Sequence, residues 1–164
     1  MTSDADVRRA RPDDVEGILD LFEDVAAERK WIATEPGFDR DRKRERVLAS
    51  MGRPRQTPCW IACDGALVAG NLSVFEDSGG EQALGMMVRA SHRRRGIGRA
   101  LLLRCLAWAR EHQIGTLSLE VFPHNAPALA LYREMGFLEI ERRERAFPRQ
   151  NGEVWDSIRM RKAV

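Results

Sequence analysis

One stretch, residues 84–109, constrains the fold of this chain more than any other. It begins with a short apolar run, residues 84–88, whose length is typical of a buried strand rather than a helix. After a basic turn, Ile97, Leu101, Cys105 and Trp108 recur at intervals of four, four and three residues. This spacing places them on one face of an α-helix. The stretch therefore predicts a strand, a turn and a helix with one buried face.

The turn, residues 93–98, reads Arg-Arg-Arg-Gly-Ile-Gly. Glycine tolerates backbone angles that point successive N–H groups inward, and it lets a ligand reach the main chain. Because the following helix adds unsatisfied N–H groups and the positive end of its dipole, a phosphate or pyrophosphate is the expected guest. A tight turn with a solvated rim of arginines remains the alternative. The turn is not a Walker loop or a complete dinucleotide fingerprint, since Arg93 stands where the fingerprint has its first glycine.

Two motifs in the chain share their order with a known family. Arg93, Gly96 and Gly98 form an R-x-x-G-x-G pattern, and residues 125–137 read N-A-P-A-L-A-L-Y-R-E-M-G-F. Together they resemble the acyl-CoA signature and the N-x-x-A-x-x-L-Y-x-x-x-G-F block of the GNAT N-acetyltransferase superfamily. The chain departs from the family pattern at Ala90, where proline is common. The resemblance implies a GNAT-like fold and acetyl-CoA as the acyl donor.

The reaction that the resemblance implies is direct attack of a neutral amine on the thioester of acetyl-CoA. Tyr132 is then the general acid, since a phenol with an ordinary pKa near 10 is protonated at neutral pH. A role as a core aromatic is the alternative for Tyr132. The general base is Glu81 or Glu120, with plain solvent exposure as the alternative for both. The predicted acetyl-CoA contacts are Met87, Val88, Arg93, Arg94, Arg95, Gly96, Ile97, Gly98, Arg99, Ala100, Asn125 and Tyr132.

The acceptor is less well defined. Trp31, Glu35 and Phe38 lie in a predicted loop that often shapes the acceptor pocket in the superfamily, although packing of the loop explains them equally well. We expect the primary amine of a small molecule, such as an amino acid, a polyamine or an amine-containing antibiotic. The alternatives are acetylation of a peptide or protein, at its amino terminus or a lysine, and a non-catalytic acyl-CoA sensor. The presence of Tyr132 argues against the sensor.

The remaining segments complete an α/β pattern. We expect a GNAT-like fold with a mixed, mostly antiparallel central sheet of about seven strands and about four flanking helices. At 164 residues the chain fits one domain, residues 1–164. Besides the elements in residues 84–109, the predicted strands are 7–10, 59–63, 67–75, 116–121, 137–147 and 153–160, and the predicted helices are 12–30, 39–51 and 125–136.

Composition excludes several classes of protein. The net charge of +2 is too small to indicate nucleic-acid binding, and no apolar run approaches the roughly 20 residues of a membrane span. The first residues do not resemble a secretory signal, so we expect a cytoplasmic monomer or homodimer. Three cysteines, an odd number, argue against a disulfide framework, and we expect Cys59, Cys63 and Cys105 to pack as small apolar residues rather than bind metal.

Overall fold

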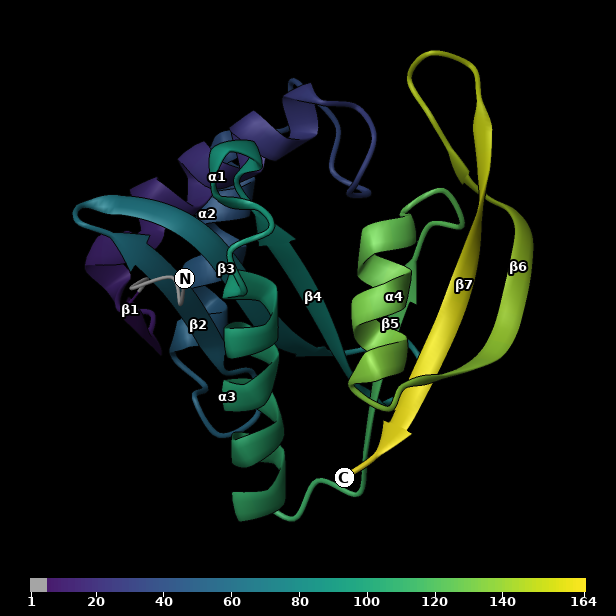
Figure 1. The fold of residues 1–164 in the computed structure, drawn as a ribbon. Helices are drawn as coiled ribbons and strands as arrows, with labels where there is room; N and C mark the ends of the chain where they lie inside the picture. The colour runs from purple at the N-terminus through teal and green to yellow at the C-terminus, as the bar shows by residue number, and fades with distance from the viewer. Residues whose placement is uncertain (1–5) are drawn as a thin grey trace.

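The computed structural model describes residues 6–164, which form one seven-stranded sheet with helices on both faces (Figure 1). The strand order is β1-β2-β3-β4-β5-β7-β6. In chain order the elements are β1 (Asp6–Arg9), the 3₁₀ turn η1 (Pro12–Asp14), α1 (Val15–Ala27), α2 (Arg40–Met51), β2 (Cys59–Asp64), β3 (Leu67–Glu76), β4 (Gln82–Val88), the 3₁₀ turn η2 (Ala90–His92), α3 (Ile97–Glu111), β5 (Thr116–Val121), α4 (Ala126–Glu134), β6 (Leu138–Pro148) and β7 (Val154–Ala163).

The sheet opens between its two central strands. β4 and β5 run parallel, and they pair only at Ala83 with Ser118 and at Leu84 with Leu119. Every other neighbouring pair among the described strands is antiparallel and more extensively paired. Beyond Leu84 the two strands separate, and Figure 1 shows them diverging toward the C-terminal ends of both. The sheet is thus two half-sheets, β1–β4 and β5–β7–β6, joined at one end of a widening gap.

Helices cover the half-sheets unequally. α3 packs on one face of β2–β4, and α1 and α2 lie over the opposite face. On the same side as α3, α4 covers β5 and β7, because Leu129 and Tyr132 belong to the same apolar cluster as Leu117 and Met160. Along β5 and β7, the residues that point away from α4 are mostly polar.

The helix boundaries follow from local chemistry. The Asp39 carboxylate accepts a hydrogen bond from the Arg42 amide (2.9 Å) at the start of α2, and the Asn125 side chain accepts one from the Ala128 amide (3.3 Å) at the start of α4. α1 ends at Ala27, so the predicted helix over residues 12–30 is too long at both ends. The chain turns at Arg29, whose φ of 52° is left-handed and incompatible with a continuing helix.

The structure confirms the predicted fold class. Residues 6–164 contain the seven strands and four α-helices that the hydrophobic periodicity predicts, in the predicted order. That residues 1–164 form one domain stays a prediction. Among the described residues, no helix is long and apolar enough to cross a membrane.

Candidate active site

The gap between β4 and β5 exposes main-chain groups that would otherwise be paired. In an antiparallel pair, alternate residues bond to the partner strand and the residues between them face away from it. The Arg89 amide donates to the Ala69 carbonyl (2.8 Å), so in the β3–β4 register Met87 also bonds toward β3. The amides of Met86 and Val88 consequently face the gap. Of the two predicted acetyl-CoA contacts on β4, the Val88 amide faces the gap and the Met87 amide faces β3.

A backbone cradle lies at the open end of this gap. Arg94 and Gly96 have left-handed φ values of 64° and 80°, and α3 begins directly after them. Within residues 6–164, the amides of residues 94–99 donate to no backbone or side-chain acceptor, whereas the Ala100 amide donates to the Gly96 carbonyl (3.0 Å). Successive unpaired amides at a helix start favour a bound anion. The side chains of Arg94 and Arg95 are exposed and add positive charge.

The Arg93 side chain connects this turn to neighbouring elements of the fold. Its Nε donates to the Val88 carbonyl (3.0 Å), and its terminal nitrogens bond both carboxylate oxygens of Glu28 (2.7 and 2.6 Å). The Arg93 guanidinium holds the pKa of Glu28 below its usual range. The Arg93 side chain therefore ties the end of β4 to the end of α1, and its predicted contact with acetyl-CoA stays a prediction.

The remaining predicted residues of this turn have distinct positions. A Cβ atom on Gly98 would lie 3.1 Å from Cδ2 of Leu131, so glycine allows the first turn of α3 to approach α4 closely. Ile97 is buried in the core, and Arg99 forms an ion pair with Glu134. The turn thus offers main-chain N–H groups to a ligand, and its side chains secure the surrounding elements.

Tyr132 lies in α4 beside the gap and is only 6% exposed. Its hydroxyl forms no hydrogen bond with any residue from 6 to 164. The hydroxyl oxygen is not fully enclosed by the protein. Burial raises the pKa of the Tyr132 phenol well above its usual value. The phenol is therefore protonated at neutral pH and has a proton to donate.

The two candidate bases differ in their surroundings. Glu81 lies before β4 at the closed end of the gap, where its two carboxylate oxygens bond Arg159 (2.6 Å) and Arg161 (2.5 Å). Glu120 lies on β5, and only its Oε1 is engaged, by the Ser157 hydroxyl at 2.5 Å with Arg143 Nη1 at 3.7 Å. Within the described chain, Oε2 of Glu120 has no hydrogen-bond or ion-pair partner. Glu120 alone of the pair keeps a carboxylate oxygen available.

The register also places Glu120 at the point where the gap begins. Ala83 pairs with Ser118 and Leu84 with Leu119, so Gly85 and Glu120 are the next residues on the two strands, at the point where pairing stops. Gly85 presents no side chain there. The structure brings Glu120, Gly85 and the start of the open strand edges to one place. Glu81 lies close to this point, because Arg159, the register partner of Glu120, bonds it.

The loop between α1 and α2 holds the three predicted acceptor contacts, and each has a partner within the protein. Trp31 Nε1 donates to Glu28 (2.7 Å), and Phe38 packs edge-on against Phe22 with 6.3 Å between ring centroids. Glu35 accepts hydrogen bonds from the Gln150 amide (3.1 and 3.0 Å). The structure gives all three a role in holding the loop, and contact with an acceptor stays a prediction for each.

A clamp that the sequence did not predict joins this loop to the β6–β7 hairpin. The side chain of Arg149 is 3% exposed and donates to the carbonyls of Ala33 (3.0 Å) and Ile32 (3.2 Å). Its guanidinium lies over the Trp155 ring at 4.1 Å from the centroid and near Glu35 at 3.4 Å. In the sequence Arg149 lies between the predicted strands 137–147 and 153–160, where a solvated turn residue is the ordinary expectation. Only the folded pairing of distant segments identifies it.

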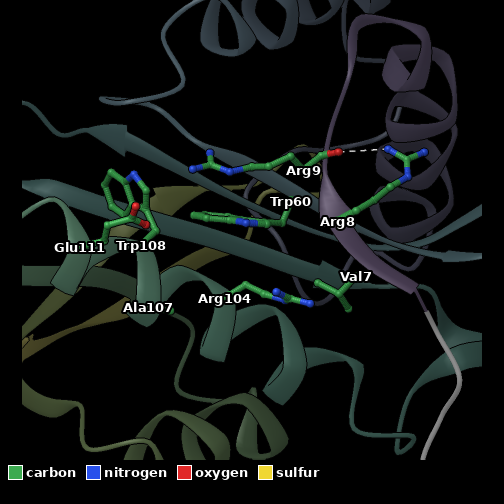
Figure 2. Close-up of a pocket in the computed structure, with 8 residues that line it drawn as sticks. All are labelled: Val7, Arg8, Arg9, Trp60, Arg104, Ala107, Trp108 and Glu111. Carbon is green, nitrogen blue, oxygen red and sulfur yellow. Dashed lines mark hydrogen bonds between the residues drawn. The ribbon is translucent and has the colours of Figure 1, made fainter.

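A cavity of about 260 Å³ lies away from the gap, between β1, β2 and α3 (Figure 2). Arg9, Trp60 and Arg104 contribute to its lining, and the Arg9 guanidinium lies 4.4 Å from the Trp60 ring centroid. None of the residues predicted to bind acetyl-CoA or the acceptor lines this cavity. Among residues 6–164 there is no group of three His, Cys, Asp or Glu side chains that could hold a metal ion.

The sequence matches the Acetyltransferase (GNAT) family over residues 19–137, more than half of the chain. The chain belongs to the GNAT acetyltransferase family. The family that the two motifs predicted is thereby confirmed.

Similarity to individual GNAT proteins is local in sequence and extensive in structure. The chain is 50% identical over 50 residues to streptothricin acetyltransferase of Streptomyces lavendulae, covering 30% of this chain and 26% of that protein. It is 38% identical over 65 residues to the ribosomal protein bS18-alanine N-acetyltransferase of Escherichia coli (strain K12), covering 40% of this chain and 44% of that protein. The matches therefore span less than half of either relative.

A solved structure extends the likeness to the whole fold. The GNAT superfamily phosphinothricin acetyltransferase from Sinorhizobium meliloti, in complex with acetyl-CoA, superposes with a TM-score of 0.85 at 18% identity. The superposition covers 100% of this chain and 89% of that one. At this identity the likeness concerns the fold alone.

Proposed function

We propose that this protein transfers the acetyl group of acetyl-CoA to a primary amine of a small molecule, by direct attack within a ternary complex. The observation that carries the proposal is the pairing of β4 with β5, which stops at Leu84 and Leu119 and leaves an unpaired strand edge leading to the amides of residues 94–99. A long ligand with a diphosphate at one end and amide groups along its arm fits such a path.

The turn and the strand edge hold the donor in this proposal. The amides of residues 94–99 bind the diphosphate, with Arg94 and Arg95 adding charge. The amides of Met86 and Val88 bond the pantetheine arm and stabilise the negative charge that develops on the thioester oxygen. Acetyl-CoA supplies the acetyl group as a thioester. Asn125, which caps α4, is the further predicted contact with the arm.

Two side chains move protons. Glu120 accepts a proton from the acceptor ammonium at Oε2, the carboxylate oxygen without a protein partner, so that a neutral amine attacks the thioester carbon. Tyr132 donates its hydroxyl proton to the sulfur as the carbon–sulfur bond breaks. The phenol is protonated at neutral pH and therefore has a proton to donate. Glu81 belongs to the ion pairs at the closed end and takes no part.

A small-molecule acceptor is favoured by the similarity to streptothricin acetyltransferase and by the Arg149 clamp, which ties the α1–α2 loop to the hairpin at the open end. The second candidate is the amino-terminal residue of a protein, supported by the similarity to ribosomal protein bS18-alanine N-acetyltransferase. A location in the cytoplasm and a monomeric or dimeric state stay predictions.

The test is release of the CoA thiol from acetyl-CoA with a panel of amino acids, polyamines, aminoglycosides and amino-terminal peptides. Glu120→Gln should lower kcat by about 10²-fold or more, within the range typical of general acid–base groups. Glu81→Gln is the matched control, and it should keep kcat while its melting temperature falls. Full kcat in a folded Glu120→Gln variant would refute the base assignment. A rise in melting temperature with acetyl-CoA, but no thiol release with any amine, would indicate the sensor instead.

A further inference from the structure

Ser157 is a buried hydroxyl that touches the proposed base. It lies on β7 and is 0% exposed, and its Oγ donates to Oε1 of Glu120 at 2.5 Å. A buried hydroxyl without a partner costs stability, and within residues 6–164 this carboxylate is its hydrogen-bond acceptor. The contact joins two residues that are 37 positions apart in the sequence.

The hydrogen bond engages one oxygen of the carboxylate and leaves the other free. Arg143 Nη1 lies 3.7 Å from the same Oε1, beyond hydrogen-bond distance, and Arg159 stands across from Glu120 in the β5–β7 register but bonds Asp77 and Glu81. The side chain of Glu120 is 35% exposed, so it can reach an acceptor. A short hydrogen bond to a buried group restricts the rotation of such a side chain.

We infer that Ser157 is a positioning residue for acetyl transfer, which fixes the Glu120 carboxylate at the point where the gap begins, with Oε2 ready to take the proton of the acceptor amine. The inference rests on the proposed function. A neutral donor suits this task because it orients the carboxylate and does not neutralise it. Glu81 shows the contrast, since two arginines occupy both of its oxygens.

The experiment compares Ser157→Ala with Ser118→Ala by steady-state kinetics and melting curves. Ser118 is a matched control, because it is also buried, 2% exposed, but its hydroxyl bonds the Gln82 carbonyl weakly at 3.5 Å and does not touch Glu120. Ser157→Ala should lower kcat roughly ten- to a hundredfold, the order expected for a misplaced catalytic group, with the KM for acetyl-CoA unchanged. Ser118→Ala should change kcat less than twofold. Ser157→Thr, which keeps the hydroxyl, should restore most of kcat.

A double-mutant cycle separates positioning from packing. In a Glu120→Gln background, Ser157→Ala should have almost no further effect on kcat, because there is no longer a base to position. An equal loss in both backgrounds would overturn the inference, as would full kcat in Ser157→Ala beside an impaired Glu120→Gln. If Glu120→Gln itself keeps full kcat, the base assignment of the proposed function is wrong. That result is distinguishable from both outcomes that overturn only the role of Ser157, because in those outcomes Glu120→Gln is impaired.

Discussion

Replacing Tyr132 by phenylalanine removes one oxygen atom from a buried side chain of α4 and leaves the ring in place. The ring packs against Phe137 with 5.9 Å between centroids and an interplanar angle of 64°. The hydroxyl forms no hydrogen bond within residues 6–164, so the substitution breaks none there. We therefore expect the free energy of unfolding to change by less than about 0.5 kcal/mol.

Turnover should respond differently. If Tyr132 protonates the departing sulfur, its loss should lower kcat on the order of a hundredfold, the lower end for general acid catalysis. A hundredfold loss corresponds to about 2.7 kcal/mol in the activation barrier. The lower end applies because a thiolate is a tolerable leaving group and water can partly replace the phenol. The KM for acetyl-CoA should hardly move, since the proton is donated only in the transition state.

The pH dependence of the free energy of unfolding tests separately whether the Tyr132 phenol is buried. Burial raises the pKa of Tyr132 in the folded state above the value near 10 expected in the unfolded chain. Above pH 10 the unfolded state loses this proton first, so the contribution to stability is complete below pH 10 and falls as pH rises further. The Tyr132→Phe variant lacks this loss. Its free energy of unfolding should therefore decline less steeply than that of the wild type in alkaline solution.

The assay is steady-state thiol release with the amine that the panel identifies, together with urea unfolding at several pH values. Full kcat in Tyr132→Phe with native stability would refute the acid assignment and make Tyr132 a packing residue. A large loss of stability would show that the hydroxyl has a structural partner, contrary to the geometry described above.

The other predictions concern the clamp and the thiols. Arg149→Met should lower the free energy of unfolding by about 2 kcal/mol, because it removes the charged hydrogen bonds to the Ala33 and Ile32 carbonyls and the ion pair with Glu35. Arg145→Met on the exposed part of the same hairpin should change the free energy of unfolding little, and equal effects of the two substitutions in urea unfolding would contradict a specific clamp. Burial raises the pKa of Cys105 to about 12 and that of Cys59 above its usual value, so neither thiol is a nucleophile at neutral pH. Cys105→Ala should keep kcat within a few-fold, and an acetylated cysteine trapped by mass spectrometry would overturn direct transfer.

The parts of this fold that the sequence predicted well are those set by local periodicity. The interval of Leu101, Cys105 and Trp108 marks the buried face of α3, and all three side chains are buried. The pattern of Arg93, Gly96 and Gly98 predicted a turn with a left-handed residue before a helix, and Gly96 has that conformation. Both predictions depend only on the identity and spacing of residues that are near one another in the sequence.

The features that the sequence did not predict depend on contacts between distant segments. α1 ends early where the chain turns at Arg29, beside the Glu28 carboxylate that Arg93 holds from 65 residues away. Glu81 precedes one predicted strand and Glu120 lies on another. Only the folded contacts show that arginines bond both carboxylate oxygens of Glu81, whereas Ser157 bonds one oxygen of Glu120 and leaves the other free. Polarity alone could not distinguish these two glutamates.

The same long-range contacts explain how the gap persists. Unpaired strand edges tend to find partners, and β4 and β5 would gain hydrogen bonds by closing along their full length. At the closed end, Arg159 bonds Asp77 and Glu81 at 2.6 Å each, which fixes where pairing stops relative to β7. At the open end, Arg149 ties the β6–β7 hairpin to the α1–α2 loop at a set distance. The half-sheets are thus held at both ends, and the strand edge between them stays available to a ligand that can pair with it.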